Sequence, residues 1–241
     1  MKFASPGFDM VSDFFGHTDG IKMSVTGNQW FVAPQIVAHF ESKSIKVYIE
    51  ALPSVLVRKR ANGAPLSLGN LQIDGIPELV CIDNNLLHGM KFSQKFEAFE
   101  DHLCIAWVGT KEQPDICKIK KEKLAIPNPR LSSAGMIFKK YYEKNCGYYG
   151  DLKGVAIICD IHHREIPQKI MSGTADYGIL WESEARYWKF KYYVPDDVEM
   201  KFSWILAKNS SQQSETVFNA IKSGVLSEYY NKYQFNNILQ K

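Results

Sequence analysis

Two neighbouring runs of the sequence carry side chains well suited to holding a small molecule. The first is Cys159-Asp160-Ile161-His162-His163-Arg164-Glu165-Ile166-Pro167, and the second ends on Tyr177-Gly178-Ile179-Leu180-Trp181-Glu182. The first run is typical of the end of a strand, a polar turn and the start of a helix, and the second of an apolar strand. Ligands of open α/β sheets gather outside the carboxyl ends of such strands. The sequence therefore predicts one wall of a small-molecule cleft.

His162, His163 and Arg164 are compatible with more than one chemistry. A metal site would need a third or fourth ligand, and adjacent histidines rarely chelate one ion well. A catalytic base would need a nucleophile or a positioned water, and no Ser/His/Asp pattern or nucleophile elbow is present. An anion is the preferred ligand, because an arginine guanidinium binds a carboxylate or an oxyanion through two parallel hydrogen bonds. A helix start exposed to water is the remaining alternative.

Polar residues also follow two other predicted strands. Residues 26–29 form a strand-to-helix turn, where free N–H groups and the helix dipole favour an anion. Asn128 ends a later strand, and Ser132 and Ser133 open the next helix, where a hydroxyl group caps the helix or contacts a ligand. An ordinary turn with a helix cap is the alternative at both places.

Two carboxylates and two tryptophans complicate a purely anionic pocket. Glu50 and Glu182 would repel an oxyanion, so one of them is expected to pair with Arg164 or with a cationic part of the ligand. Trp30 and Trp181 could provide flat apolar walls, although buried tryptophans more often belong to the core.

The composition is that of an ordinary globular protein. The 241 residues are 45% hydrophobic and 23% charged, and the net charge of +3 is too small and too scattered to indicate nucleic-acid binding. No stretch approaches the roughly 20 apolar residues of a membrane span. The amino terminus lacks the apolar segment of a secretion signal, so we expect either a cytosolic protein or a signal segment that has been removed.

The five cysteines form no CxxC pair and no metal-ligand spacing. Cys81, Cys104 and Cys159 lie in apolar predicted strands, and we expect them to be small core residues. An odd number of cysteines argues against a disulfide framework, although one bridge remains possible.

Hydrophobic patterning predicts two α/β series joined by extended segments. The expected strands cover residues 21–25, 45–50, 78–82, 124–126, 155–159 and 177–181, with extended segments at 96–107, 192–194 and 202–206. Five helices are expected. One has Pro34 in its first turn, two cover residues 54–60 and 133–145, and a fourth follows Pro167. The last begins at Ser210, with Gln213 as the capping-box partner of that serine.

The chain resembles the bacterial type II periplasmic solute-binding proteins, and among them the molybdate-binding-protein-like branch. That branch usually reads Glu-Thr-Leu-Pro-Pro-Gly after its second strand, whereas this chain has Glu50-Ala51-Leu52-Pro53-Ser54-Val55. The resemblance spans nearly the whole chain in the right order. It is carried by Pro6-Gly7-Phe8-Asp9, Gly27-Asn28-Gln29-Trp30-Phe31-Val32, Tyr48-Ile49-Glu50-Ala51-Leu52-Pro53, Ile126-Pro127-Asn128-Pro129, His162-His163-Arg164-Glu165-Ile166-Pro167 and Gly173-Thr174-Ala175-Asp176-Tyr177-Gly178-Ile179-Leu180-Trp181-Glu182-Ser183-Glu184.

The resemblance implies an α/β chain of two lobes, with two doubly wound sheets joined by two extended crossovers. Lobe I is expected at residues 1–103 and 195–241, lobe II at 104–194, and the hinge near 100–110 and 188–200. Hinge closure around a ligand is the natural motion of such a protein. Members of the wider family bind oxyanions through backbone donors and hydroxyl groups at facing helix starts.

The function implied is that of a periplasmic receptor that captures a small anion for an ABC importer. The anion would be molybdate-like or a compact organic acid. The expected partner is the membrane permease of the importer, and the protein is expected to be a monomer whose signal segment is not present in this chain. No catalytic residue, cofactor or metal ligand is predicted. The expected ligand-binding residues are Thr26, Gly27, Asn28, Gln29, Glu50, Asn128, Ser132, Ser133, His162, His163, Arg164, Trp181 and Glu182.

Two alternatives stay open. The same fold serves as the ligand-sensing domain of transcriptional regulators, which would require a DNA-binding segment elsewhere in the gene. A receptor for a metal or a metal chelate would instead use His162, His163, Glu50 and Glu182.

Overall fold

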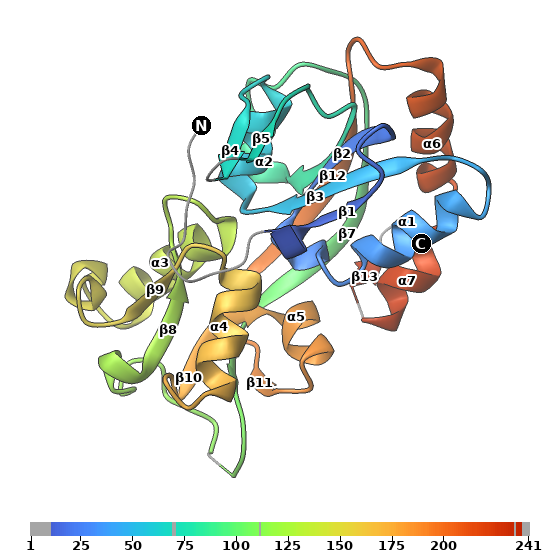
Figure 1. Ribbon diagram of the computed structural model, residues 1–241. Helices are drawn as coiled ribbons and strands as arrows, with labels where there is room; N and C mark the ends of the chain where they lie inside the picture. Colours follow the sequence, from blue (N-terminus) through green and yellow to red (C-terminus); the bar gives the residue numbers. More distant parts are fainter. Residues whose placement is uncertain (1–10, 69–70, 111, 234, 238–241) are drawn as a thin grey trace. The chain divides into compact units, whose positions relative to one another are not determined.

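The computed structural model describes residues 11–68, 71–110, 112–233 and 235–237 (Figure 1). The chain forms two compact units: unit 1 comprises residues 1–100 and 201–241, and unit 2 comprises residues 101–200. The predicted lobe boundaries after residues 103 and 194 stay a prediction. The run Pro6-Gly7-Phe8-Asp9, which contributed to the resemblance, lies outside the described residues. Within the described ranges, every helix is too short or too polar to cross a membrane.

Unit 1 is built on a sheet with a parallel centre. Strand β2 (Ile21–Thr26) lies between β3 (Val47–Leu52) and β6 (Leu79–Asp83) and runs parallel to both. These strands are apolar and buried on both faces, as parallel strands covered by helices must be. Antiparallel neighbours extend the sheet on either side: β1 (Phe14–Gly16) pairs with β3, and β12 (Glu199–Ala207) pairs with β6.

Among the described residues, four α-helices belong to unit 1, and the first two of them follow the parallel strands β2 and β3. Their bounds are α1 (Ala33–Glu41), α2 (Ser54–Ala61), α6 (Gln212–Lys222) and α7 (Ser227–Lys232). The first two contact the sheet, and both start where the sequence predicted. A hairpin of β4 (Leu66–Leu68) and β5 (Leu71–Ile73) occupies the segment that was expected to be a glycine-rich turn. One long strand, β7 (Phe92–Trp107), pairs with β13 (Asn236–Asn237) in unit 1 and continues into unit 2.

Unit 2 repeats this plan with three parallel strands. Strand β8 (Leu124–Pro127) lies between β9 (Ile157–Cys159) and β10 (Tyr177–Trp181), and the second half of β7 pairs antiparallel with β10 and with β11 (Lys191–Tyr193). The helices that follow the parallel strands are α3 (Ser133–Asn145), α4 (His162–Met171) and α5 (Glu182–Tyr187). Figure 1 shows α4 over the sheet, where it contacts β8 and β10.

Short 3-10 turns connect several of these elements. They are η1 (Val11–Asp13), η2 (Gly27–Gln29), η3 (Asn84–Leu86), η4 (Lys121–Lys123) and η5 (Tyr149–Leu152). The turn η2 directly follows β2 and contains Gly27, Asn28 and Gln29, which the sequence predicts to bind the ligand.

Two predicted helix starts were wrong. The sequence placed the start of α4 after Pro167, whereas the helix begins at His162. The Glu165 carboxylate accepts hydrogen bonds from the N–H groups of Asp160 and Ile161 at 2.9 and 3.3 Å, which satisfies donors that the helix itself leaves unpaired. The proline then removes a single donor from an established helix.

The last predicted helix also starts differently. Its N-cap is Ser211 rather than Ser210, and the Ser211 hydroxyl accepts a hydrogen bond from the N–H group of Ser214. The helix stops at Lys222, and Gly224 follows with a positive φ of 92° that glycine adopts without strain. A separate helix, α7, continues the chain.

The five cysteines comprise three free thiols and one disulfide pair. Cys81, Cys104 and Cys159 are buried free thiols, which confirms them as core residues. Cys117 and Cys146 form one disulfide, the bridge that the sequence left possible. The bridge ties the segment before β8 to the residue after α3. Disulfides of this kind persist in oxidising compartments.

Removing the disulfide should destabilise unit 2. The bridge closes a loop with a sequence separation of 29, for which chain entropy predicts a loss of about 3 to 4 kcal/mol when it is absent. We expect the Cys117→Ser/Cys146→Ser double variant to show this loss in urea unfolding, with no further effect of dithiothreitol. A wild-type protein whose unfolding curve is the same with and without dithiothreitol, once reduction is verified by thiol titration, would contradict the assignment.

Candidate functional site

The parallel strands of unit 2 bring three helix starts to one edge of the sheet. Pro127 of β8 is aligned with Cys159 of β9, and Ala125 of β8 is aligned with Gly178 of β10. The residues after these strands therefore leave the sheet side by side. They include the predicted site residues of unit 2, which are Asn128, Ser132, Ser133, His162, His163, Arg164, Trp181 and Glu182.

Ser132 offers a buried hydroxyl group at the start of α3. It is the N-cap residue by position and is completely buried, yet its Oγ makes no cap bond and has no hydrogen-bond partner within the described chain. Gly135 holds this turn close to the strand end: a Cβ there would lie 2.6 Å from the carbonyl oxygen of Pro127. A buried hydroxyl without a partner costs free energy that a bound ligand can recover.

His162 begins α4 and faces Glu184 of α5. Its Nε2 atom lies 3.9 Å from Oε1 of Glu184, and both side chains are almost completely inaccessible to solvent. Neither ring nitrogen of His162 nor Oε1 of Glu184 has a hydrogen-bond partner in the described residues. The second oxygen of Glu184 accepts a hydrogen bond from the N–H group of Trp181 at 2.9 Å, which fixes the carboxyl group at the end of β10.

Burial shifts the pKa values of this pair in opposite directions. Desolvation raises the pKa of Glu184 well above 4.5, and the nearby Asp101 charge adds to this effect. Desolvation lowers the pKa of His162 well below 6.5, and His163 contributes to this effect. Both shifts favour the neutral forms of the two groups, in which the pair presents hydrogen-bonding groups rather than two charges.

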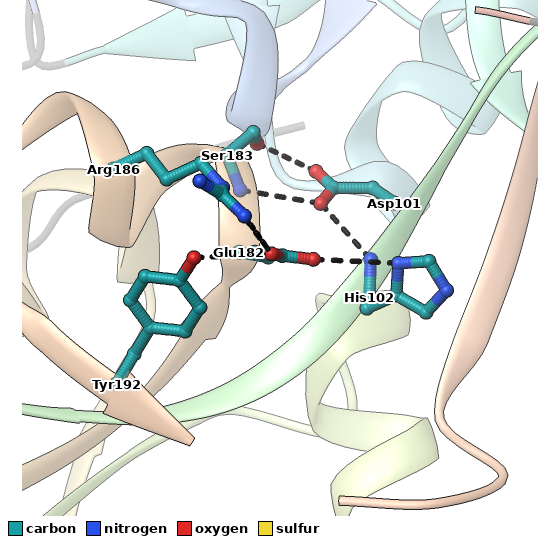
Figure 2. A network of polar contacts seen from close by, with 6 residues as sticks. All are labelled: Asp101, His102, Glu182, Ser183, Arg186 and Tyr192. Carbon is teal, nitrogen blue, oxygen red and sulfur yellow. Dashed lines mark hydrogen bonds and ion pairs between the residues drawn. The ribbon is translucent and has the colours of Figure 1, made fainter. Parts of the chain in front are cut away.

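Glu182 belongs to a separate polar network (Figure 2). Its carboxylate forms an ion pair with Arg186, four residues later in α5, and accepts a hydrogen bond from the hydroxyl of Tyr192 at 3.2 Å. His102 Nδ1 lies 3.5 Å from the other oxygen. Each of the two carboxylates thus has an arginine partner nearer in the chain, Arg186 for Glu182 and Arg60 for Glu50, and the expected pairing with Arg164 or with a cationic part of the ligand stays a prediction.

Asp101 anchors the start of α5 in the same view (Figure 2). Its carboxylate accepts hydrogen bonds from the hydroxyl and the N–H group of Ser183, at 2.6 and 3.3 Å, and from the N–H group of His102 at 3.0 Å. This buried residue lies in β7, so it ties the helix that carries Glu184 to the long strand.

Asn128 connects two strand ends of unit 2. Its amide nitrogen donates to Asp160 at 2.7 Å, and its amide oxygen accepts from the N–H group of Arg130 at 2.9 Å. The backbone N–H of Asn128 also donates to the carbonyl of Cys159. These bonds indicate a positioning role, and a ligand contact from Asn128 stays a prediction.

The predicted residues at the end of β2 in unit 1 form an internal relay. The hydroxyl of Tyr230 donates to Gln29, the amide nitrogen of Gln29 donates to Thr26, and the hydroxyl of Thr26 donates to Asn28, at 2.8, 3.1 and 2.8 Å. All four of these side chains are buried. These hydrogen bonds fix the turn that contains Gly27. They also occupy polar groups of Thr26 and Gln29 that were expected from the sequence to bind the ligand.

Glu50 in β3 is buried in an ion pair with Arg60 of α2. The Nε–H group of Arg60 lies 2.9 and 3.1 Å from the two carboxylate oxygens, and both side chains are at most 2% exposed. The remaining guanidinium nitrogens donate to the carbonyl oxygens of Ala64 and Gly75. Burial raises the pKa of Glu50, and the Arg60 charge opposes that rise. Glu50 therefore fastens β3 to α2, and Arg60 fastens α2 to the segment that follows it.

Sequence reasoning missed three of these residues. Glu184 lies three residues after Trp181, where a glutamate often caps a helix, and this spacing could have identified it. Arg186 stands four residues after Glu182, which is a recognisable helix ion pair. Asp101 had no local signal, because its partner Ser183 is 82 residues away.

The Glu50–Arg60 pair predicts a large loss of stability when one partner is removed. The Arg60→Met variant leaves a buried carboxylate without its counter-ion, which should cost about 3 to 5 kcal/mol in the free energy of unfolding. The Glu50→Gln/Arg60→Met double variant should recover part of this loss. Urea titration measures both values, and a single variant as stable as the wild type would contradict the assignment.

The neutral His162–Glu184 pair predicts how stability depends on pH. Above about pH 4.5 an unfolded chain loses the proton of Glu184, whereas the folded protein keeps it, so this residue lowers stability as pH rises towards its folded pKa. The lowered pKa of His162 acts oppositely: its contribution falls as pH drops below about 6.5.

The matched variant for this prediction is Glu184→Gln. The unfolding free energy of the wild type minus that of Glu184→Gln should fall by about 1.4 kcal/mol per pH unit above pH 4.5, until the folded protein also deprotonates. The exposed Glu143→Gln variant on α3 is the control and should show no such trend. A Glu184→Gln difference that stays constant between about pH 5 and pH 8 would exclude a neutral Glu184.

Comparison with known proteins places this geometry in a recognised fold. No protein-family model and no curated protein matches the sequence. The periplasmic molybdate-binding protein of Azotobacter vinelandii superposes with a TM-score of 0.69 at 14% identity, covering 89% of this chain and 98% of that one. An ABC-type phosphate transport receptor from Vibrio cholerae has a TM-score of 0.55 at 9% identity, covering 89% and 99%.

A third similar structure is that of iron-bound HitA from Pseudomonas aeruginosa. It has a TM-score of 0.61 at 10% identity, covering 90% of this chain and 85% of that one. At these identities the likeness establishes the fold and leaves the ligand open. The chain thus has the two-lobed α/β fold of the type II periplasmic binding proteins, as the sequence predicted.

Proposed function

We propose that this protein is an extracytoplasmic solute-binding protein that captures a small anion and delivers it to the permease of an ABC importer. The molybdate and phosphate receptors with the same fold support this class of function. The disulfide between Cys117 and Cys146 is consistent with a location outside the reducing cytoplasm. A molybdate-like oxyanion or a compact organic acid is the expected cargo.

The observation that carries the proposal is the set of buried polar atoms at the strand ends of unit 2. Ser132 Oγ, the ring nitrogens of His162 and Oε1 of Glu184 have no hydrogen-bond partner among the residues the structure describes, and they follow β8, β9 and β10 respectively. Native proteins leave few such groups unsatisfied, and those that persist have a reason. A small anion that accepts hydrogen bonds from the Ser132 hydroxyl and from the one N–H group of the His162 ring would supply a missing partner to each.

Arg164 gives the same strand ends a positive charge. It is 8% exposed and stands two residues after His162 in the first turn of α4. A guanidinium held at a helix start suits a carboxylate or an oxyanion. The two carboxylates that would repel an anion are neutralised, since Glu50 pairs with Arg60 and Glu182 with Arg186. The same pairing makes both carboxylates poor candidates for binding a metal.

The contribution of unit 1 stays a prediction. Asn28 is completely buried at the turn after β2, and its neighbours Thr26 and Gln29 hold that turn in place. Capture of one anion by groups from both units, followed by hinge closure, would require Asn28 to affect the same binding event as Ser132.

Calorimetry with molybdate, sulfate, phosphate and small organic acids tests the proposal. We expect one of these anions to bind, and Ser132→Ala to weaken its binding by about 10-fold, the loss of one hydrogen bond to a charged group. Ser132→Ala should leave the stability of the free protein unchanged or raise it, because the Oγ atom has no partner there.

Matched variants separate a binding role from a general disturbance. Ser172→Ala, at an exposed serine of the same unit, should change neither affinity nor stability by a measurable amount. Asn28→Ala should weaken the same anion if unit 1 takes part. A wild-type protein that is folded and binds none of these anions would refute the proposed function.

A further inference from the structure

The pairing of His162 with Glu184 has a consequence for how an anion is held. The two side chains come from different helices, α4 and α5, and their nearest polar atoms lie 3.9 Å apart, too far for a hydrogen bond. Both are completely buried. A small approach of the two groups would form the bond that neither atom has among the described residues.

Several ionisable groups lie around Glu184, and the charge that acts on it is that of Asp101 in β7. His162 lies 3.9 Å away on α4, where His163 and Arg164 are the next residues in the chain; Cys104 acts from β7, and Glu182 and Arg186 belong to α5 itself. Arg186 is engaged by Glu182. A negative charge on Glu184 would therefore lie beside Asp101 in a site with little water, where like charges repel strongly.

A bound anion would add a further negative charge to this site. An ionised Glu184 would then oppose binding, whereas a protonated carboxyl group can donate a hydrogen bond. His162 can connect the Glu184 carboxyl group to the anion, because a neutral imidazole accepts a hydrogen bond at one nitrogen and donates one at the other. If the Glu184 O–H group donates to Nε2, the proton of the imidazole sits on Nδ1 and is available to the anion.

We propose that anion capture is coupled to one proton, which Glu184 holds and which sets the tautomer of His162 that donates to the anion. This inference rests on the proposed function and names a regulation of the same site. Glu184 is a positioning residue here, because it acts on the ligand through His162. Where the free protein has lost this proton, binding takes one up from solvent, and no covalent bond forms or breaks.

The coupling predicts that affinity falls as pH rises, whereas the affinity of a cation receptor would rise. As pH rises above the titration of the free pair, the affinity for an anion should fall by up to 10-fold per pH unit. Glu184→Gln keeps a hydrogen-bond donor and cannot ionise, so this variant should bind the anion without that loss. A cation receptor would bind more tightly at high pH and would lose binding when Glu184 loses its charge.

Calorimetry between about pH 6 and pH 9 tests the coupling, with molybdate as the probe or, if only phosphate binds, with phosphate after correction for its own ionisation. Titrations in buffers of different ionisation enthalpy count the protons taken up. We expect the wild type to take up close to one proton wherever the free pair has lost its proton, and Glu184→Gln to take up none. At the low end the two proteins should agree in affinity within about threefold.

The outcomes separate the two proposals. Anion binding that is independent of pH and takes up no proton overturns the coupling and leaves the proposed function intact. A folded Glu184→Gln variant whose affinity at low pH is more than 10-fold weaker than that of the wild type also overturns the coupling and leaves the proposed function intact. Glu143→Gln controls for a change of surface charge and should behave as the wild type does. Absence of anion binding by the wild type overturns both proposals.

Discussion

The site depends on the cost of burying polar groups without partners. At the carboxyl ends of β8, β9 and β10, the chain places a hydroxyl, an imidazole and a carboxyl group out of contact with water. Each would be better hydrated in an unfolded chain, so the fold maintains them at an energetic cost. Such groups are expected where a ligand completes the hydrogen bonding, and their position at strand ends is the usual one for ligands of α/β sheets.

The two carboxylates among the predicted site residues are each paired with an arginine of their own unit. Glu50 is matched by Arg60, and Glu182 by Arg186, with Tyr192 and His102 around it. The first pair connects β3 to α2 in unit 1, whereas the second lies within α5 of unit 2. Arg164 stands in the first turn of α4, where a guanidinium suits an anionic ligand.

Much of this arrangement could be predicted from local sequence. Helix α3 and strand β10 have the bounds that apolar periodicity and flanking turn residues indicated, because those signals act over a few residues. The placement of Ser132 and His162 at strand ends followed from the same patterns. Partner choice could not be predicted in this way: His162 meets Glu184, and Asp101 meets Ser183, only after separate elements pack. The start of α4 was missed because Glu165 caps the helix from inside, ahead of Pro167.

A crystal structure of the protein with molybdate, located by its anomalous scattering, tests the central claim most directly. The account predicts one ordered anion within hydrogen-bond distance of Ser132 Oγ and of a ring nitrogen of His162. If the anion is instead ordered elsewhere, with Ser132 and His162 still lacking partners, the strand ends of unit 2 are not the binding site.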